Sequence, residues 1–570
     1  MSDAPANDPV QVEPTAQVER DRQMINAARE QGTGSLFWAF TRLSGPGWLQ
    51  SAITLGGGSL AGSLYLGVLA GYGAMWWQPL AMIMGVIMLS AIGYVTLSTG
   101  ERPFDAINKH INPVLGWSWA IATLMANLVW CMPQYGLGTA ALRKNLMPET
   151  LGDANQWVAI GLLFVVTGIV IVFYDAGGWA VKVFDFILKA MVAVVVISFF
   201  AVVVRMSVAG DLDWGQIMIG FIPDFSMMQR PSAAFADVLA DTGDYRSYWE
   251  NIIVSEQRDA MIASAATAVG INMTFLLPYS MLRKGWDRDF RGLAIFDLST
   301  GLFIPYLLAT SCVVIASATA FHAQEAPGLV AEMEAEVTAS PKLQGGYAKL
   351  LDGRLAVEHG EAWQAMDDTQ KASLRAELPE GDRRIAAMII RRDTDDFAAA
   401  LSRLSDETTA QKVFGIGVLG MAVSTIIILM LINGFVLTEI LGMPGHKGLH
   451  LLGCFMASIS GAVGSATLWT GDAKAYLAVP TSLFGMVLLP IAYITFLLMM
   501  NSKSLLGENK PTGMQMARWN LFMVLATAFA TFCCMWSIYN SSNRVLGFSA
   551  LGVLAVLAVV VHFASSKKPS

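Results

Sequence analysis

Twelve long apolar stretches constrain the fold of this 570-residue chain more than any other feature of its sequence. About 20 consecutive apolar residues form a helix long enough to cross a bilayer. The chain is 54% hydrophobic and only 14% charged, with a mean hydropathy of +0.51, which excludes an ordinary soluble domain. The sequence therefore predicts an all-α polytopic membrane protein with about 12 transmembrane helices. These spans cover roughly residues 48–72, 75–99, 114–142, 157–174, 178–205, 259–281, 293–320, 413–438, 449–470, 475–501, 518–539 and 545–563.

Glycines interrupt the first of these spans. The segment begins with Gly45-Pro46-Gly47 and is broken by Gly56-Gly57-Gly58-Ser59, yet no charged residue falls between Trp48 and Gln78. Three consecutive glycines free the backbone and favour unwinding of the helix. Unwound backbone at membrane depth is tolerated only inside protein or beside a water-filled cavity. The pattern therefore predicts a broken transmembrane helix with a cavity beside the break.

The sixth span carries a second set of helix-breaking residues. Gly270, Asn272, Thr274 and Pro278 cluster near its middle. Proline removes a backbone donor and clashes one turn back, so we expect Pro278 to open the helix near Thr274. A polar asparagine at mid-depth is costly unless it has a partner.

The two interrupted spans lie five spans apart, which is the spacing expected of two five-helix repeats with inverted topology. In such five-plus-five transporters of the amino acid-polyamine-cation type, cargo binds near the midplane between broken helices 1 and 6. The polar and flexible residues near the breaks, with one amide from span 3, are the predicted substrate-binding site. They are Gly56, Ser59, Asn272 and Thr274 first, then Thr54, Gly57, Met273 and Gln134.

The spans divide the chain into predicted segments. We expect residues 1–35 to be a disordered cytoplasmic tail without a cleavable signal peptide, and the two membrane repeats to cover 36–206 and 259–501. An extracytoplasmic segment over 207–258 separates the repeats. Helices 11 and 12 and a C-terminal tail occupy 502–570.

An acidic insert over residues 322–411 interrupts the second repeat. It holds 17 Asp and Glu against 10 Lys and Arg, a net charge of −7 that equals that of the whole chain. The pattern of residues 385–404 indicates an amphipathic helix. We expect a small extracytoplasmic helical cap, whose charge either gathers cations or forms a solvated surface.

The distribution of basic residues predicts the orientation. The loop over 282–292 carries four Lys and Arg, the loop over 502–517 carries Lys503 and Lys510, and the chain ends near Lys567-Lys568. With the N-terminus inside, these segments face the cytoplasm, as the positive-inside rule requires. We expect a multi-pass protein of the inner cell membrane, with the lipid bilayer as partner.

Several function classes lack support in the sequence. The chain has no P-loop, catalytic triad or HExxH motif, so we expect neither an enzyme nor an ATP-driven pump, and no cofactor. Nothing indicates nucleic-acid binding. The five cysteines all lie in apolar spans and fit small packing residues.

Several motifs together carry a family resemblance from about Gly45 to Glu508, apart from the insert. They are Gly45-Pro46-Gly47, Gly67, Gly71, Tyr72, Asp297, Ser424-Thr425-Ile426, Pro490 and Leu506-Gly507-Glu508. In these residues and spacings the chain resembles the Nramp (natural resistance-associated macrophage protein) metal-ion transporters. The resemblance implies the five-plus-five fold and the transport of a metal ion.

The residues at the family's metal-binding positions are different here. In the family, an Asp and an Asn of helix 1 and a Met of helix 6 ligate a divalent metal. The matching residues are Gly56, Ser59 and Asn272, and Thr274 replaces the family's His. The resemblance therefore implies an Nramp-like chain without the Asp-Pro-Gly-Asn and Met-Pro-His motifs, and the ligands of any metal stay open.

Further substitutions concern the driving ion. The family's helix-3 carboxylates, which are tied to proton movement, correspond to Met132 and Tyr135, and a Gln of its helix 10 corresponds to Leu488. A coupling ion is therefore possible, but these positions disfavour the proton.

Three functions stay open from the sequence. The first is a secondary transporter that moves a metal cation by alternating access with altered ligands, for example a hydrated or non-transition cation. The second is a carrier of a neutral or zwitterionic small solute such as an amino acid. The third is a non-transporting membrane sensor or scaffold that acts through the insert.

Overall fold

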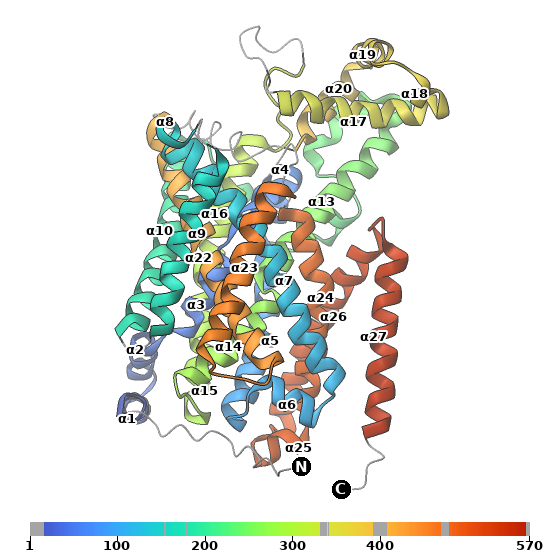
Figure 1. Cartoon of the computed structure of the whole chain (residues 1–570). Helices are drawn as coiled ribbons and strands as arrows, with labels where there is room; N and C mark the ends of the chain where they lie inside the picture. Colours follow the sequence, from blue (N-terminus) through green and yellow to red (C-terminus); the bar gives the residue numbers. More distant parts are fainter. Residues whose placement is uncertain are drawn as a thin grey trace.

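The protein is a bundle of long helices with a smaller group of helices at one end, as the computed structural model in Figure 1 shows. The structure describes residues 16–152, 155–176, 179–330, 339, 341–391, 407–468 and 478–565. Within these ranges every regular element is a helix. The all-α prediction is confirmed.

Among the described residues, eleven helical stretches are long and apolar enough to cross a membrane, and a bent pair of helices raises the number to twelve. This confirms the predicted number of spans. The bent pair is α3 (Pro46–Thr54) and α4 (Gly57–Ala70). The others are α5 (Trp77–Thr99), α7 (Pro113–Ala140), α9 (Gln156–Ala176), α10 (Trp179–Ala209), α13 (Arg246–Ala268) with α14 (Ile271–Arg283), α15 (Arg291–Asp297) with α16 (Ile304–Phe321), α22 (Glu407–Ile440), α23 (Lys447–Thr467), α24 (Ala478–Asn501), α26 (Gly513–Tyr539) and α27 (Arg544–Ser565).

Helix 1 breaks at the glycines, as the sequence predicts. The bent pair changes direction by 57°. Leu55 leaves helical geometry, and Gly56 is extended with φ −107° and ψ −179°. A Cβ on Gly56 would overlap Thr425 Oγ1 of α22. Glycine at this position therefore frees the backbone and also lets α22, the eighth transmembrane helix, approach the break.

Helix 6 is also broken, but not where the sequence placed the break. The interruption falls at Val269 and Gly270, both extended, while Pro278 lies inside the continuous helix α14. The expectation that Pro278 opens the helix near Thr274 is wrong. Gly270 is decisive because an added Cβ would lie 2.5 Å from the ring of Trp130 in α7. The tight contact with α7, the third transmembrane helix, sets the position of the break.

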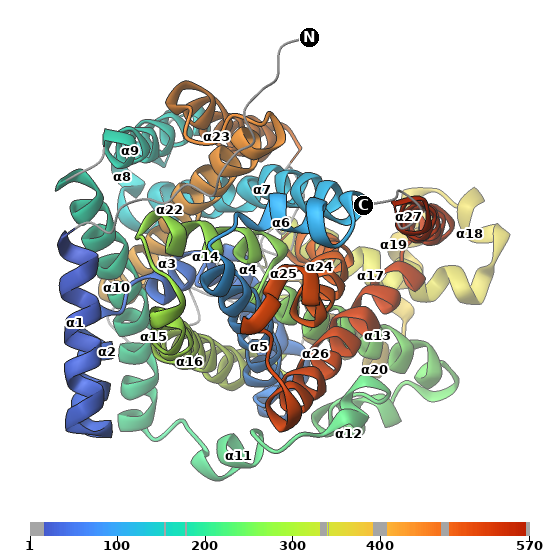
Figure 2. The ribbon, with the colours of Figure 1, turned by 90° about the horizontal axis from the view of Figure 1, so that it is seen from below.

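The N-terminal segment is folded where the sequence predicted disorder. Helices α1 (Ala16–Gln31) and α2 (Thr33–Leu43) lie together at one edge of the bundle in Figure 2. Val18 and Ile25 are buried, and Arg22 is 2.5 Å from the Asp287 carboxylate in the loop after α14. The prediction of disorder is wrong for residues 16–35, because an amphipathic face docks on the bundle. Residues 1–15 lie outside the described residues.

The insert folds into short helices that pack on an extension of helix 6. They are α17 (Pro341–His359), α18 (Glu361–Ala365), α19 (Asp368–Glu377) and α20 (Glu380–Ile389). Helix α13 begins at Arg246, well before the span predicted from 259, and its Trp249 and Ile253 join Leu355 and Ile385 of the insert in a second apolar core. The predicted amphipathic helix over 385–404 is described only up to residue 391.

A buried ion pair joins two helices of the insert, and its carboxylate also bonds to α13. Arg354 Nε lies 3.2 Å from Asp382 Oδ2, and both side chains are almost fully buried. The indole N–H of Trp249 donates to the same carboxylate. The insert is therefore joined to the outer half of a broken transmembrane helix.

Breaking this ion pair should loosen the insert. We expect Asp382→Leu to cost about 3–5 kcal/mol of local stability. The buried Arg354 guanidinium would be left with the partly exposed Glu358 as its ionic partner, and the Trp249 N–H would lose its acceptor. Hydrogen exchange of the α17 and α20 amides in the full chain measures the effect. Arg375→Met is the control, since its pair with Asp352 is partly exposed, and we expect about 0–1 kcal/mol. Equal exchange in the two variants would contradict the role assigned to the buried pair.

Candidate functional site

A small cavity lies where the two broken helices meet. Its volume is about 40 Å³. Each water molecule needs roughly 10–15 Å³ of such space, so the cavity has room for a few waters or an ion. Its walls come from transmembrane helices 1 (α3 and α4), 3 (α7), 6 (α13 and α14), 8 (α22) and 10 (α24). The lining residues are Ile53, Thr54, Gly56, Gly58, Ser59, Trp130, Pro133, Gln134, Ala266, Thr267, Gly270, Asn272, Met273, Thr425, Leu429, Thr481 and Ser482.

Most of the predicted site residues lie in this wall. The six that do are Thr54, Gly56, Ser59, Gln134, Asn272 and Met273. Gly57 lies behind it, and its N–H donates to Gln134 Oε1 at 2.7 Å. That bond holds the start of α4 against helix 3.

Thr274 does not line the cavity, which corrects its assignment to the site. Its hydroxyl accepts a hydrogen bond from Trp119 Nε1 at 2.9 Å and donates to the Ile271 carbonyl. Two residues along a helix correspond to about 200° of rotation, so Thr274 and Asn272 face opposite sides of α14.

Neutral oxygens and one sulfur surround the cavity. The Ser59 hydroxyl donates to the Thr54 carbonyl, which the helix break has freed. The Thr54 hydroxyl lies 3.1 Å from Met273 Sδ and 3.4 Å from the Ala268 carbonyl, at the end of α13. These contacts therefore join residues before and after each break. Thr54 bonds to Ser59 across the break in helix 1, and it contacts both Ala268 and Met273 on the two sides of the break in helix 6. Displacing these weak internal bonds would present carbonyl and hydroxyl oxygens to a ligand.

Asn272 carries an unsatisfied amide. Its Oδ1 accepts the backbone N–H of Met273 at 2.8 Å in the first turn of α14. Its Nδ2 has no hydrogen-bond partner among the described residues, although the side chain is buried. A buried amide without a partner costs about 1–3 kcal/mol. A water or a hydrated ligand in the cavity would supply the missing bond.

Several wall residues were not among the predicted site residues. Trp130 donates to the Thr481 carbonyl at 2.8 Å and closes one side, and Ser482 joins from the same helix 10. Thr425 stands in the Ser-Thr-Ile motif that supports the family resemblance, which was the available signal. Thr267 carried no signal, because its place depends on where helix 6 breaks.

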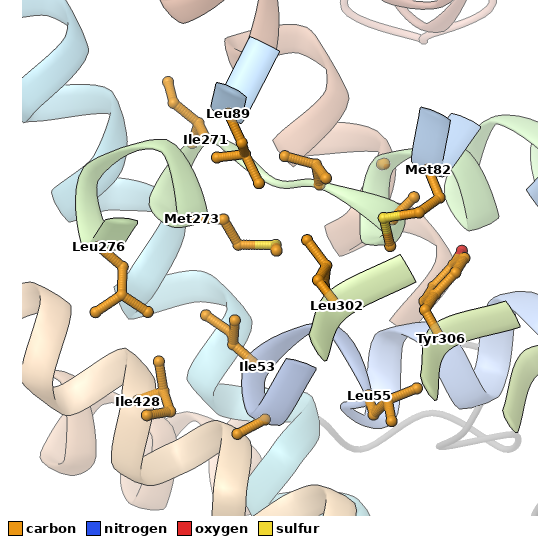
Figure 3. Packing of buried hydrophobic residues seen from close by; sticks show 14 of the residues in the cluster. Ile53, Leu55, Met82, Leu89, Ile271, Met273, Leu276, Leu302, Tyr306 and Ile428 are labelled. Carbon is orange, nitrogen blue, oxygen red and sulfur yellow. The ribbon is translucent and has the colours of Figure 1, made fainter. Parts of the chain in front are cut away.

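Apolar side chains pack on the far side of Met273. Figure 3 shows it among Ile53, Leu276, Leu302 and Ile428, all of them buried. Such packing leaves little room for water on that side. In this conformation the cavity is therefore small and mostly apolar, with a few neutral polar groups in its wall.

Charged metal ligands are missing from the part of the wall that the structure describes, which holds no carboxylate or imidazole. Among the described residues, no group of three or more His, Cys, Asp or Glu could hold a metal. A carboxylate does lie at the start of helix 1: Asp297, fully buried, accepts the N–H groups of Gly45 at 3.1 Å and Gly47 at 2.6 Å. Asp297 therefore holds the N-terminal end of α3 and lies outside the cavity wall.

Comparison with protein-family models identifies the family of this chain. The model of the family "Natural resistance-associated macrophage protein-like" matches residues 47–351 and 385–540. The chain belongs to the Nramp family. The match leaves out residues 352–384, which lie in the insert of this Nramp protein. No curated protein sequence matches it significantly.

Solved structures show the same fold. The chain is similar to the manganese transporter of Eremococcus coleocola in complex with an aromatic bis-isothiourea substituted compound, and to two point mutants of that transporter, one with a histidine replaced by alanine and one with a glutamate replaced by glutamine. In each case the TM-score is 0.63 at 13% identity, over 93% of this chain and 96% of the other. The predicted five-plus-five inverted-repeat fold is confirmed.

Proposed function

We propose that this Nramp protein is a secondary transporter that moves a divalent cation by alternating access, and that the cation keeps part of its water shell in the cavity between Thr54, Ser59 and Asn272. Family membership supports the transport of a metal ion. The described wall residues include no carboxylate and their polar groups are all neutral, and this observation supports the retained water.

The free energy of dehydration supports this choice of cargo. Removing a divalent cation from water without compensating charge is very costly. Mg²⁺ in particular dehydrates reluctantly and usually keeps several waters in protein sites. Hydroxyl, amide and carbonyl groups can hydrogen-bond such waters or replace a few of them. Transition metals prefer carboxylate, imidazole or thiolate ligands, which the described wall residues do not provide.

The size of the cavity weighs against an amino acid. A volume of about 40 Å³ admits a small ion with a few waters but not a solute with several carbon atoms. A sensor or scaffold role has support only from the docked insert. The family and the cavity together favour the cation transporter over both alternatives.

Alternating access would use the two broken helices as the moving part. α4 packs against α13 and α3 against α14, while α7 and α22 pack on each other beside them. We infer that helices 1 and 6 rock against a scaffold that includes helices 3 and 8. Tyr135, at a family carboxylate position, is bonded to Ser458 at 2.6 Å, which supports uptake without proton coupling. The chain is a multi-pass membrane protein, and we assign it to the inner cell membrane.

Uptake by liposomes tests the cargo. We expect the purified protein to carry Mg²⁺, without acidification of the liposome interior. Met273→Leu should change Mg²⁺ uptake less than about twofold, because a thioether is a poor ligand for a hard cation and leucine has a similar volume. Uptake measured with a fluorescent Mg²⁺ indicator, and with a pH dye in parallel, checks both expectations.

Two outcomes would overturn the proposal. Uptake confined to Cd²⁺ or Mn²⁺ and lost in Met273→Leu would assign a sulfur-ligated transition metal instead. Uptake of a labelled amino acid without any cation uptake would assign the neutral-solute alternative. Empty liposomes and liposomes with the Asn272→Leu variant serve as controls.

A further inference from the structure

A second and larger cavity lies at the edge of the bundle, toward the side that carries the insert. Its volume is about 680 Å³. It is bounded by α13, by the end of α26 and by the loop after α11 (Trp214–Ile219), which lie on the same side of the molecule in Figure 2. Aromatic rings dominate its inner wall: Trp77, Phe529, Phe532 and Trp536. The cargo cavity uses none of these residues.

An arginine without a carboxylate partner among the described residues stands in this wall. The Arg258 guanidinium stacks on the Trp536 ring, 4.5 Å from its centroid, and its Nε donates to the Val254 carbonyl at 3.1 Å. No described carboxylate forms an ion pair with it, and neighbouring Glu256 pairs with Arg391 at 2.5 Å. The adjacent Asp259 attracts Arg258 electrostatically but forms no ion pair with it, so the terminal N–H groups of this half-buried cation are suited to an anionic ligand.

The acidic groups at the rim are already engaged. Glu250 bonds to Arg246 at 2.8 Å on the same helix. Asp224 accepts two bonds from Ser226 and lies 3.8 Å from Arg230. The rim therefore offers the Arg258 guanidinium, which has no ion pair among the described residues, and the exposed Arg230, whose pair with Asp224 is long at 3.8 Å.

Exposed apolar side chains beside the cavity point to a lipid. Phe225 and Phe532, which line it, are 62% and 47% exposed. The adjoining loop exposes further apolar side chains, namely Met218, Ile219 and Ile222. Apolar groups next to arginines at the end of a transmembrane bundle are typical of the membrane interface. A soluble anion would match the charge but would leave these apolar groups in water.

We propose that this cavity binds an anionic phospholipid of the adjacent leaflet. The phosphate contacts Arg258, with Arg230 at the rim, and the acyl chains follow Phe529 and Phe532. Arg258 belongs to α13, the same helix that ends at Ala268 beside the cargo cavity. The lipid would therefore brace the outer half of broken helix 6.

Lipid-dependent thermal unfolding of the full-length protein in detergent tests this proposal. We expect phosphatidylglycerol to raise the midpoint and phosphatidylcholine to leave it nearly unchanged. Arg258→Gln should weaken the apparent affinity for phosphatidylglycerol about tenfold, because a charge-assisted bond to phosphate is lost. Asn251→Trp, at an exposed position of the wall, should obstruct part of the cavity and weaken the effect without changing its charge.

The matched control is Arg544→Gln, an exposed arginine at the start of α27 outside the cavity, which should bind like the unmodified protein. Native mass spectrometry of the same variants gives the lipid count independently of any change in stability. Equal stabilisation by the two lipids would overturn the proposal. So would undiminished phosphatidylglycerol binding in Arg258→Gln, or equal stabilisation by inorganic phosphate alone.

Discussion

Asn272→Leu should lower cation uptake by roughly 30–100-fold, which corresponds to about 2–3 kcal/mol. Leucine fills a similar volume but removes the amide that lines the cavity and the oxygen that accepts the Met273 N–H. Asn272→Asp should act in the opposite direction on affinity, because it keeps an acceptor oxygen and adds a negative charge near the cation. Uptake rates at several Mg²⁺ concentrations, in liposomes with equal protein content, measure both effects.

Thr274→Val is the control for this experiment. It stands two residues from Asn272 on the same helix, but its hydroxyl bonds to Trp119 rather than facing the cavity. We expect it to lower stability by about 1 kcal/mol and to leave the half-saturating cation concentration unchanged. A loss of affinity in Thr274→Val as large as in Asn272→Leu would show that the cargo lies elsewhere.

Asp297→Leu should destabilise the N-terminal end of α3, the first half of broken helix 1, by about 3–5 kcal/mol. The buried carboxylate accepts two backbone N–H groups, from Gly45 and Gly47, and the Ser44 hydroxyl. Leucine would leave these donors buried without an acceptor, and helix α3 would be released from α15. Hydrogen exchange of the peptide that contains Gly45 and Gly47 should accelerate, and the unfolding midpoint should fall.

Two milder variants calibrate this result. Asp297→Asn keeps one acceptor oxygen without the charge, so about half of the loss is expected. Ser44→Ala removes one hydroxyl donor but no acceptor and should cost about 1 kcal/mol. If exchange at Gly45 and Gly47 stayed slow in Asp297→Leu, the carboxylate would not be what holds this end of the helix.

The membrane architecture could be predicted from sequence because it depends on local properties. A span of about 20 apolar residues forms a helix in lipid whatever its neighbours are, since its backbone must bond internally. The break at Gly56 follows from backbone freedom in the same way. The five-span spacing of the two interrupted helices predicted the repeat arrangement, and the family motifs supported it; the structure and the comparisons confirm this fold.

The break in helix 6 shows where local reasoning failed. Proline was the strongest local signal, yet Pro278 lies inside α14 because a helix can continue through proline when neighbouring helices support it. The break falls instead at Gly270, where the Trp130 ring of helix 3 leaves no room for a side chain. That contact joins residues far apart in the chain and has no local signature.

The sequence by itself determined the number of membrane helices, the break in helix 1 and the uncharged character of the candidate site, because these depend on residue type and near neighbours. Tertiary structure alone decided which polar groups face the cavity. It turned Thr274 toward Trp119, brought Thr425 and Ser482 to the wall, and docked the N-terminal helices and the insert on the bundle. Each of these depends on packing between distant segments, and a rotation of one residue on a helix is enough to change it.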